Sequence, residues 1–322
     1  MQESKIVICM STYNGEKFLA SQLDSFIDQD YQNWELVVHD DGSTDGTIKL
    51  IQRYQARDRR IKLIPGDGHQ GIKQAFLSLL TKVEGDYYAF SDQDDVWHAN
   101  KLTTLLRTLA SEPSATPTLV YSRYDEIDGA GNRIPRTGRQ PIYKTQLKDL
   151  LLINTVTGCT VMFNRSLRNQ LIAPLASLDI EALHMHDWWA ALVASALGKV
   201  IFVDQELVSY RQHGTNVLGA PGHLDFGVRL RKFLHLAESR IVHSGSRQAQ
   251  QLLSCYSNQL KSQQVPLVRG VANLFEGWHP LHNFRFLKTN HLFISSKFLN
   301  IELTILLFLP PRARRRVFAR ND

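Results

Sequence analysis

The stretch Ala89-Phe90-Ser91-Asp92-Gln93-Asp94-Asp95-Val96-Trp97 places three carboxylates directly after strand-forming residues that begin at Tyr87. Side chains alternate along a strand, so Asp92 and Asp94 would project to the same side if the strand direction continued. Converging carboxylates repel one another unless a cation lies between them, and oxygen ligands suit Mg2+ or Mn2+. The alternative interpretation is a polar loop whose aspartate caps a helix over residues 99–109.

Strand and helix patterns alternate along the first 110 residues. Apolar runs typical of buried parallel strands lie at 5–10, 35–38, 61–64 and 87–90, and helical patterns lie at 16–29, 47–56, 72–83 and 99–109. This alternation predicts an α/β fold with a mainly parallel sheet and helices on both faces. Ligands of such sheets bind beyond the carboxyl ends of the strands, where the polar runs 11–14, 40–45 and 92–95 are found.

Two common nucleotide-binding motifs are missing from the sequence. No Gly-x-Gly-x-x-Gly follows the first strand, and no Gly-x-x-x-x-Gly-Lys-Ser/Thr occurs anywhere. The sequence therefore argues against a dinucleotide dehydrogenase and against a P-loop enzyme.

Residues beyond 112 have a more varied pattern. Strands are predicted at 118–122, 157–163, 200–203 and 207–210, with a turn at Asp128-Gly129. The helix predicted from Asp187 to Leu197 is apolar almost all round, so we expect it to pack beneath the sheet. Asp187 itself has the position of a helix N-cap, which is a common structural role.

Composition and cysteine usage set the class of protein. The chain has 322 residues, of which 43% are hydrophobic and 21% charged, enough to bury a core in one large domain or two smaller ones. Cys9, Cys159 and Cys255 lie far apart without metal-ligand spacing, which favours a reducing compartment. The first residues lead straight into a strand, so we expect no secretory signal and a cytoplasmic location.

Charge is distributed unevenly along the chain. From residue 223 onward fifteen Lys and Arg face five Asp and Glu, a net charge of +10, whereas residues 1–222 carry −4. The tail is also predicted to be helical and amphipathic from about Pro221, with Val228 to Leu236 mixing apolar and basic residues. An anionic partner is implied, and the apolar content favours a membrane surface over nucleic acid.

The segment from Phe298 to Leu309 is strongly apolar but short. A transmembrane helix needs roughly 20 apolar residues, and this segment contains Glu302 and stops at Pro310. We interpret it as an interfacial helix lying on lipid, with four arginines reaching anionic head groups: Arg312, Arg314, Arg315 and Arg316. A packed core helix with a solvated charged tail is the alternative.

Five motifs occur in a characteristic order: Ser11-Thr12-Tyr13-Asn14-Gly15, His39-Asp40-Asp41-Gly42-Ser43-Thr44-Asp45, Ser91 to Trp97, His186-Asp187-Trp188-Trp189, and Tyr210-Arg211-Gln212-His213-Gly214-Thr215-Asn216. As an ordered set they resemble the family 2 glycosyltransferases with a GT-A fold, and the third and fifth look most like bacterial rhamnosyltransferases. The resemblance covers residues 5 to about 217. It implies a GT-A catalytic domain over 1–220. The helical, basic region over 221–322 carries no motif of the family, and its charge and apolar content predict that it associates with a membrane.

The resemblance implies roles for residues on the nucleotide side. Tyr13 would stack on the base, Asp41 would accept its imide N-H, and the same pocket would be lined by Ser11 and Asp40. Uracil and thymine both offer that N-H, so a UDP or dTDP sugar is expected. Lys73, after a glycine-rich turn, is expected near the diphosphate, although a lysine at a helix start is more often solvent-exposed.

The resemblance also implies the reaction. Asp94 and His213 would bind a divalent metal ion, Mg2+ or Mn2+, and Asp92 would contact the ribose or the same metal. A metal ion stabilises the charge that develops on a nucleotide diphosphate leaving group. Asp187 matches the family's base, which takes the proton of the acceptor hydroxyl, so single displacement with inversion is expected.

The donor and acceptor are expectations from the family alone. The leading donor is dTDP-L-rhamnose, with UDP-Gal or UDP-GlcNAc as alternatives, and the acceptor is a lipid-linked oligosaccharide at the inner face of the cell membrane. Two other interpretations stay open. A nucleotide-sugar pyrophosphorylase would carry a glycine-rich loop where Ser11 to Phe18 lies. A non-catalytic nucleotide-sugar-binding protein is disfavoured by the joint presence of four residues: Asp92, Asp94, Asp187 and His213.

Overall fold

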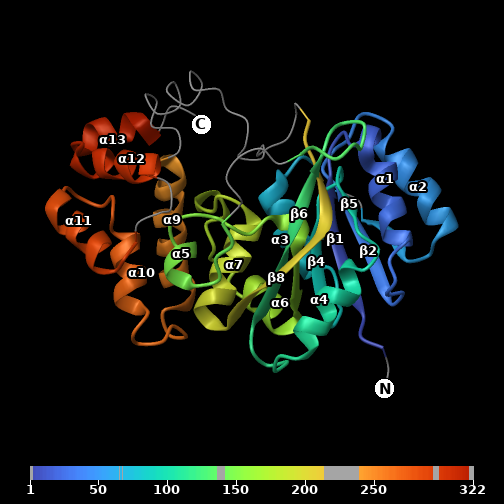
Figure 1. Ribbon diagram of the computed structural model, residues 1–322, viewed down its shortest axis with the longest axis horizontal. Helices are drawn as coiled ribbons and strands as arrows, with labels where there is room; N and C mark the ends of the chain where they lie inside the picture. Colours follow the sequence, from blue (N-terminus) through green and yellow to red (C-terminus); the bar gives the residue numbers. More distant parts are fainter. Residues whose placement is uncertain are drawn as a thin grey trace.

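An eight-stranded sheet of order β3-β2-β1-β4-β7-β6-β8-β5 runs through the protein. The computed structural model describes residues 3–64, 66, 68–135, 142–213, 239–292 and 297–318. Figure 1 shows the sheet with a layer of helices on each face, and a further group of helices packed outside one of these two layers. The predicted α/β architecture is confirmed.

The parallel half of the sheet is the half that the sequence predicted. β1 (Ile6–Thr12), β2 (Trp34–Asp40), β3 (Ile61–Ile64) and β4 (Tyr87–Ser91) pair in parallel. Most residues of the first two strands are buried on both faces, which explains why their apolar residues run continuously instead of alternating. All four strands end at the same edge of the sheet.

The other half differs from the prediction in two places. β8 (Lys199–Arg211) is one strand, paired with β6 (Thr118–Ile127), where two short strands were predicted. Register shifts near Arg123 let the ladder continue past the polar residues that suggested a break. β7 (Val161–Asn164) is shorter than predicted because residues Gly158–Thr160 form a 3-10 turn, and β5 (Val96–Trp97) pairs with β8.

Helices cover the two faces of the sheet in separate layers. One core contains α1 (Glu16–Ile27), α2 (Thr47–Arg57) and α4 (Lys101–Ala110). The opposite core contains three longer helices and one short one: α3 (Ile72–Thr81), α5 (Leu147–Leu150), α6 (Arg165–Ile172) and α7 (His186–Leu197). Adjacent residues of β1 alternate between these cores, as strand geometry requires.

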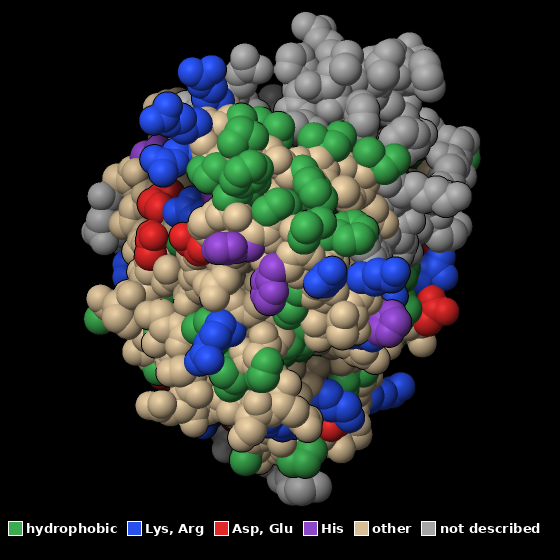
Figure 2. All heavy atoms as spheres, turned by 90° about the vertical axis from the view of Figure 1, so that its left-hand side faces the viewer, with side chains coloured by type: hydrophobic (Ala, Val, Ile, Leu, Met, Phe, Trp, Pro, Cys, Tyr) green, Lys and Arg blue, Asp and Glu red, His purple; other side chains and the backbone are tan. Residues whose placement is uncertain are grey.

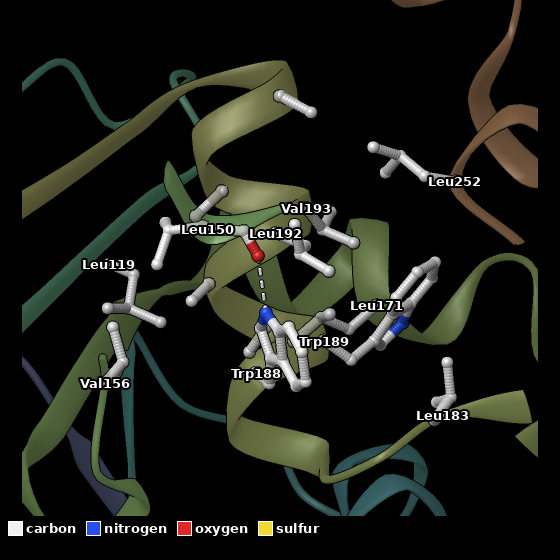
Figure 3. Close-up of a cluster of buried hydrophobic side chains, with 14 of the residues drawn as sticks. Leu119, Leu150, Val156, Leu171, Leu183, Trp188, Trp189, Leu192, Val193 and Leu252 are labelled. Carbon is white, nitrogen blue, oxygen red and sulfur yellow. Dashed lines mark hydrogen bonds between the residues drawn. The ribbon is translucent and has the colours of Figure 1, made fainter. Parts of the chain in front are cut away.

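Helix α7 lies at the centre of the second core. Trp188 and Trp189 are fully buried, and the Trp188 indole Nε1 donates to the Leu150 carbonyl oxygen at 2.6 Å (Figure 3). The predicted packing of this apolar helix beneath the sheet is therefore confirmed. Because its first turn carries Asp187, the buried tryptophans fix the position of that carboxylate relative to the sheet.

The described residues of the C-terminal part contain five helices: α9 (Ser239–Tyr256), α10 (Val265–Ala272), α11 (Pro280–Thr289), α12 (Lys297–Phe308) and α13 (Pro311–Phe318). Val242, Ala249 and Leu252 of α9 join the same core as α7. The helix predicted from Pro221, with Val228 to Leu236, lies outside the described residues. No helix among the described residues has the length and apolar content needed to cross a membrane.

The segment predicted to lie on lipid forms α12, which has one face buried in the protein and one face exposed to solvent. Leu303, Leu306 and Leu307 are buried, whereas Ile301 and Ile305 are exposed. The prediction that Arg314 reaches lipid head groups is wrong. Arg314 is buried, and its guanidinium donates to the Gly277 carbonyl oxygen.

Candidate active site

The acidic residues that follow β4 point in different directions. β4 ends at Ser91, so Asp92 to Asp95 lie in a turn and do not follow the alternation of a strand. The Asp94 carboxylate Oδ2 lies 2.7 Å from His213 Nε2. Asp95 faces the interior instead, where its Oδ1 accepts the Arg211 backbone N-H at 3.0 Å. The alternative role for these acids as a helix cap is wrong, because the N-cap of α4 is Asn100 and makes no side-chain cap bond.

Arg211 holds the end of β8 against this turn. Its Nε donates to the Asp94 carbonyl oxygen at 2.7 Å and its Nη1 to the Asp128 carbonyl oxygen at 3.1 Å. The guanidinium also lies over the Phe18 ring, 4.9 Å from the ring centroid. His213 follows two residues later, with its ring 4.8 Å from the same phenylalanine ring. Arg211 and Phe18 therefore position His213 beside Asp94.

Asp187 lies in the first turn of α7 and is buried. Its Oδ1 accepts hydrogen bonds from Asn154 Nδ2 at 3.1 Å and from the Trp188 N-H at 2.5 Å. Burial raises the pKa of Asp187 to about 6, and hydrogen bonds including those from Trp188, Gly158 and Asn154 act against that rise. The N-cap of α7 is Met185, so the N-cap interpretation of Asp187 is wrong.

Asp92 connects the acidic turn to Asp187 electrostatically. Burial raises the pKa of Asp92 well above its ordinary value, and the charges of Asp95, Asp94 and Asp187 raise it further. Carboxylates from two distant parts of the chain therefore act together on Asp92 at this edge of the sheet. Such a group favours a cation or a proton among its members.

The residues fit a divalent cation at Asp94 and His213. A carboxylate and an imidazole in contact form a mixed oxygen and nitrogen donor set, which suits Mn2+ and tolerates Mg2+. Within the described ranges, Asp92, Asp95 and Cys159 are the one group of three candidate ligands whose atoms lie within 4.8 Å of one another. Asp92 thus does not form such a group with Asp94 and His213, and its role as a ligand stays a prediction.

The group of Asp95 and Cys159 has the character of a structural cluster. Both residues are buried, and burial raises the pKa of the Cys159 thiol well above its ordinary value, so a thiolate ligand is disfavoured. Lys101 is fully buried beside them. Its Nζ donates to the Cys159 carbonyl oxygen at 2.5 Å and lies 3.1 Å from the centroid of the Trp97 ring. A hard cation would not select this site.

The predicted base-binding side has one exposed aromatic ring. Tyr13 is 49% exposed, and its ring centroid lies 5.0 Å from that of His69. Its backbone is held by Gln93, whose side-chain Oε1 accepts the Tyr13 N-H at 2.9 Å and whose Nε2 donates to the Tyr13 carbonyl oxygen at 3.0 Å. A Cβ atom on Gly15 would come within 2.3 Å of the Gln93 amide, so a larger residue there would displace Gln93 from these bonds. The ring is free to stack on a planar ligand.

Asp40 and Asp41 are both engaged within the protein. Asp40 accepts the Thr12 hydroxyl at 2.9 Å and the Ser43 hydroxyl at 2.6 Å. Asp41 accepts the N-H groups of Gln70 and Gly71 at 2.6 and 3.0 Å, and so fixes the turn before α3. A carboxylate has about four acceptor positions, so a base imide N-H could share Asp41. Their contact with a nucleotide stays a prediction.

Ser11 and Lys73 lie on either side of this region. Ser11 is half-buried near the end of β1, opposite His39 in the register with β2. Lys73 Nζ donates to the Leu183 carbonyl oxygen at 3.1 Å and lies 3.2 Å from Glu181. The lysine therefore faces the segment that leads into α7, which rules out the solvent-exposed alternative. Its contact with a diphosphate stays a prediction.

A family model matches most of this region. The model described as glycosyl transferase family 2 covers residues 7–172, about half of the chain. This chain belongs to glycosyl transferase family 2. The matched part contains Tyr13, Asp41, Asp92 and Asp94, whereas Asp187 lies beyond it. The predicted family is confirmed.

Two curated relatives illustrate the range within the family. The chain is 33% identical over 175 residues to UDP-Glc:alpha-D-GlcNAc-diphosphoundecaprenol beta-1,3-glucosyltransferase WfgD of Escherichia coli, which covers 54% of this chain. The aligned part is 66% of that protein, just under two thirds of its length. The chain is 27% identical over 220 residues to dTDP-rhamnosyl transferase RfbG of Shigella flexneri, covering 66% of this chain and 74% of that protein.

The fold resembles that of a solved transferase. Mannosyltransferase PcManGT from Pyrobaculum calidifontis, solved in complex with GDP-Man and Mn2+, aligns over 99% of this chain and 85% of its own. The TM-score is 0.54 and the sequence identity 16%, so the similarity concerns the fold. The predicted GT-A fold is confirmed.

Proposed function

We propose that the protein is an inverting, metal-dependent glycosyltransferase that moves a sugar from a nucleotide diphosphate to a saccharide acceptor. The contact of 2.7 Å between Asp94 and His213, which lie 119 positions apart in the sequence, carries this proposal. Asp187 is a buried carboxylate with a pKa of about 6. Its charge helps to raise the pKa of Asp92, which lies in the same acidic turn as Asp94. A metal site next to a base is what this reaction requires.

The acidic turn and the end of β8 would bind the donor. Asp94 and His213 would hold Mg2+ or Mn2+, with Asp92 at the ribose or at the same ion. A bound divalent ion supplies charge neutralisation for the diphosphate leaving group. The exposed Tyr13 ring would stack on the base, within a pocket shaped by Ser11, Asp40 and Asp41, and Lys73 would lie near the diphosphate.

Asp187 would act on the acceptor. An acceptor hydroxyl is a weak nucleophile near neutral pH, and a carboxylate that takes its proton as the new bond forms contributes about 100-fold to 10,000-fold. A pKa of about 6 leaves Asp187 mostly ionised at pH 7, and it is more basic than an ordinary aspartate. Attack from the face opposite the leaving group would invert the anomeric carbon.

The donor we favour is dTDP-L-rhamnose, and the process is the synthesis of a bacterial surface polysaccharide. The similarity to RfbG, a dTDP-rhamnosyl transferase, supports the donor. WfgD, which acts with UDP-Glc on a diphosphoundecaprenol-linked sugar, supports a lipid-linked acceptor and keeps a UDP-sugar as the alternative donor. Such an acceptor would place the protein at the cytoplasmic face of the membrane.

A panel of nucleotide sugars tests the proposal through release of free nucleotide diphosphate, with and without Mn2+. Asp187→Asn should lower kcat by about 100-fold to 10,000-fold and leave donor affinity unchanged, because the base acts on the acceptor. Asp28→Asn, at an exposed position after α1, is the matched control. Unchanged kcat in Asp187→Asn would remove that residue from the mechanism. Donor binding without hydrolysis or transfer of any sugar would favour a non-catalytic binding protein.

A further inference from the structure

Exposed apolar side chains gather on one part of the C-terminal helices. Seven large apolar side chains are exposed among the described residues, and five of them lie between 278 and 308. Three are spaced four and three residues apart along α12, so they form one stripe on that helix. We call the five side chains the tail face: Trp278, Leu281, Ile301, Ile305 and Phe308.

Contacts between the helices hold the segments that carry the tail face together. α11 and α12 pack against each other, and the bond from Arg314 to the Gly277 carbonyl joins α13 to the segment that bears Trp278. Figure 2 shows hydrophobic side chains gathered over the upper part of this side of the molecule, where Figure 1 places α12 and α13. Single exposed apolar residues are normal on a protein surface, but several of them on neighbouring segments indicate a site that binds a partner.

Basic side chains outnumber acidic ones in the segments that carry the tail face. Residues 276–318 contain seven Lys and Arg but only two Asp and Glu, and Glu302 is buried. The exposed basic residues come from α11 and α13: Arg285, Lys288, Arg312, Arg315 and Arg316. Figure 2 shows Lys and Arg side chains at the left edge of the hydrophobic group and below it, with a smaller group of Asp and Glu side chains also on the left. The partner must therefore be apolar at its centre and anionic around it.

We propose that the tail face docks on an anionic lipid bilayer, with its apolar side chains among the acyl chains and its arginines at the head groups. α12 has 12 residues, so it would lie in the plane of the interface. A second copy of the chain fits less well, because pairing the same face about a twofold axis would bring two basic rims together.

The position of the tail face suits a transferase that acts on membrane-linked sugars. In Figure 1 the chain enters β1 from the lower edge, so the parallel strands end toward the upper edge, and α12 and α13 also lie toward that edge. Docking there would bring the candidate active site near the bilayer surface. This use rests on the proposed function, whereas the binding of lipid does not.

Sedimentation of the full chain with vesicles tests the proposal. Vesicles with 30% phosphatidylglycerol should bind the protein, and pure phosphatidylcholine vesicles should bind it far more weakly. Ile305→Glu should weaken binding at least about tenfold, because a charge replaces an inserted apolar group. Ile142→Glu is the matched control, since Ile142 and Ile305 are both 39% exposed. Donor hydrolysis, measured in parallel without vesicles, should be equal in all variants that fold.

The arginines have a matched control of their own. Each basic residue near an anionic surface contributes about fivefold in affinity, so reversing Arg312, Arg315 and Arg316 to Glu should weaken binding at least about a hundredfold. The same reversal at Arg53, Arg57 and Arg59, exposed on or just after α2, should have little effect. Equal loss in both triple variants, or no loss in Ile305→Glu, would overturn the proposal. A dimer in solution that Ile305→Glu dissociates would assign the face to a second copy instead.

Discussion

Asp94 and Asp95 are neighbours in the sequence and carry the same carboxylate, but they serve different parts of the molecule. Asp94 faces His213 at 2.7 Å and is partly accessible, whereas Asp95 is buried near Cys159 and Lys101. The turn after β4 sends one side chain outward to the site and the next one inward to the core. A run of acids can therefore supply both a ligand and the support that holds the ligand in place.

The support is built from the chain on both sides of the site. Asp95 accepts the Arg211 N-H, and Arg211 in turn donates to the Asp94 carbonyl oxygen. These bonds join the acidic turn to β8 just before His213. Loss of an inner residue should therefore destabilise the protein, and loss of an outer one should weaken ligand binding.

The largest effect is expected from Lys101→Met. This change removes the donor to the Cys159 carbonyl and the amine that lies near Asp95, both in the interior. The free energy of unfolding in urea should fall by about 3 kcal/mol, because buried polar groups then lack a partner. Asp95→Asn in the same chain should recover part of the loss, and Lys49→Met on the surface should change little.

Lys101→Met also tests the separation of roles between Asp94, which we place at the metal site, and Asp95, which we place in the supporting core. If Lys101→Met kept its stability but lost Mn2+ affinity, the lysine would belong to the site and the division into outer and inner groups would be wrong. We expect Mn2+ affinity in Lys101→Met to stay within about tenfold of the original, below the loss of about 10-fold to 100-fold that is typical when a residue bonded to a metal ligand is changed.

A smaller effect separates the two aspartates directly. Asp94→Ala should weaken Mn2+-dependent donor binding at least about tenfold and leave the free energy of unfolding nearly unchanged. Asp95→Ala removes the same atoms but should cost about 1 to 3 kcal/mol in stability, because the Arg211 N-H loses its acceptor. Calorimetric titration and urea unfolding of both variants give the comparison. Equal effects on binding would mean that both acids hold the metal.

The sequence predicted much of the fold, because its strongest patterns are local. Continuous apolar runs located the parallel strands, and β3 has the predicted bounds of Ile61 and Ile64. β8 was predicted as two strands because residues 204–206 are polar, but the register shifts in its pairing with β6 place them at the surface without ending the ladder. The extra residues lie in β8 itself, and the sequence pattern did not distinguish such a bulge from the end of a strand.

The site was predicted less completely than the fold. The motif order brought Asp94 and His213 together, and the structure places them in contact. The alternation rule for Asp92 and Asp94 failed because the strand ends one residue earlier. Gln93, Lys101 and Arg211 were missed as supports, since their roles depend on bonds to residues 58 to 117 positions away. Their positions next to the acidic and histidine motifs were the available signal.

The smallest effect concerns the pH dependence of the proposed base. Asp187 must be ionised to accept a proton, and burial raises its pKa to about 6. kcat/KM should therefore be constant above about pH 7 and fall tenfold per unit of pH below 6. His186 beside it has a pKa lowered by burial to about 3, so it stays neutral in this range. Asp92 and Asp95 also have raised pKa values, so Asp187→Asn is the decisive control. If its residual activity kept the same acid slope, the titrating group would be one of the acids of the turn after β4.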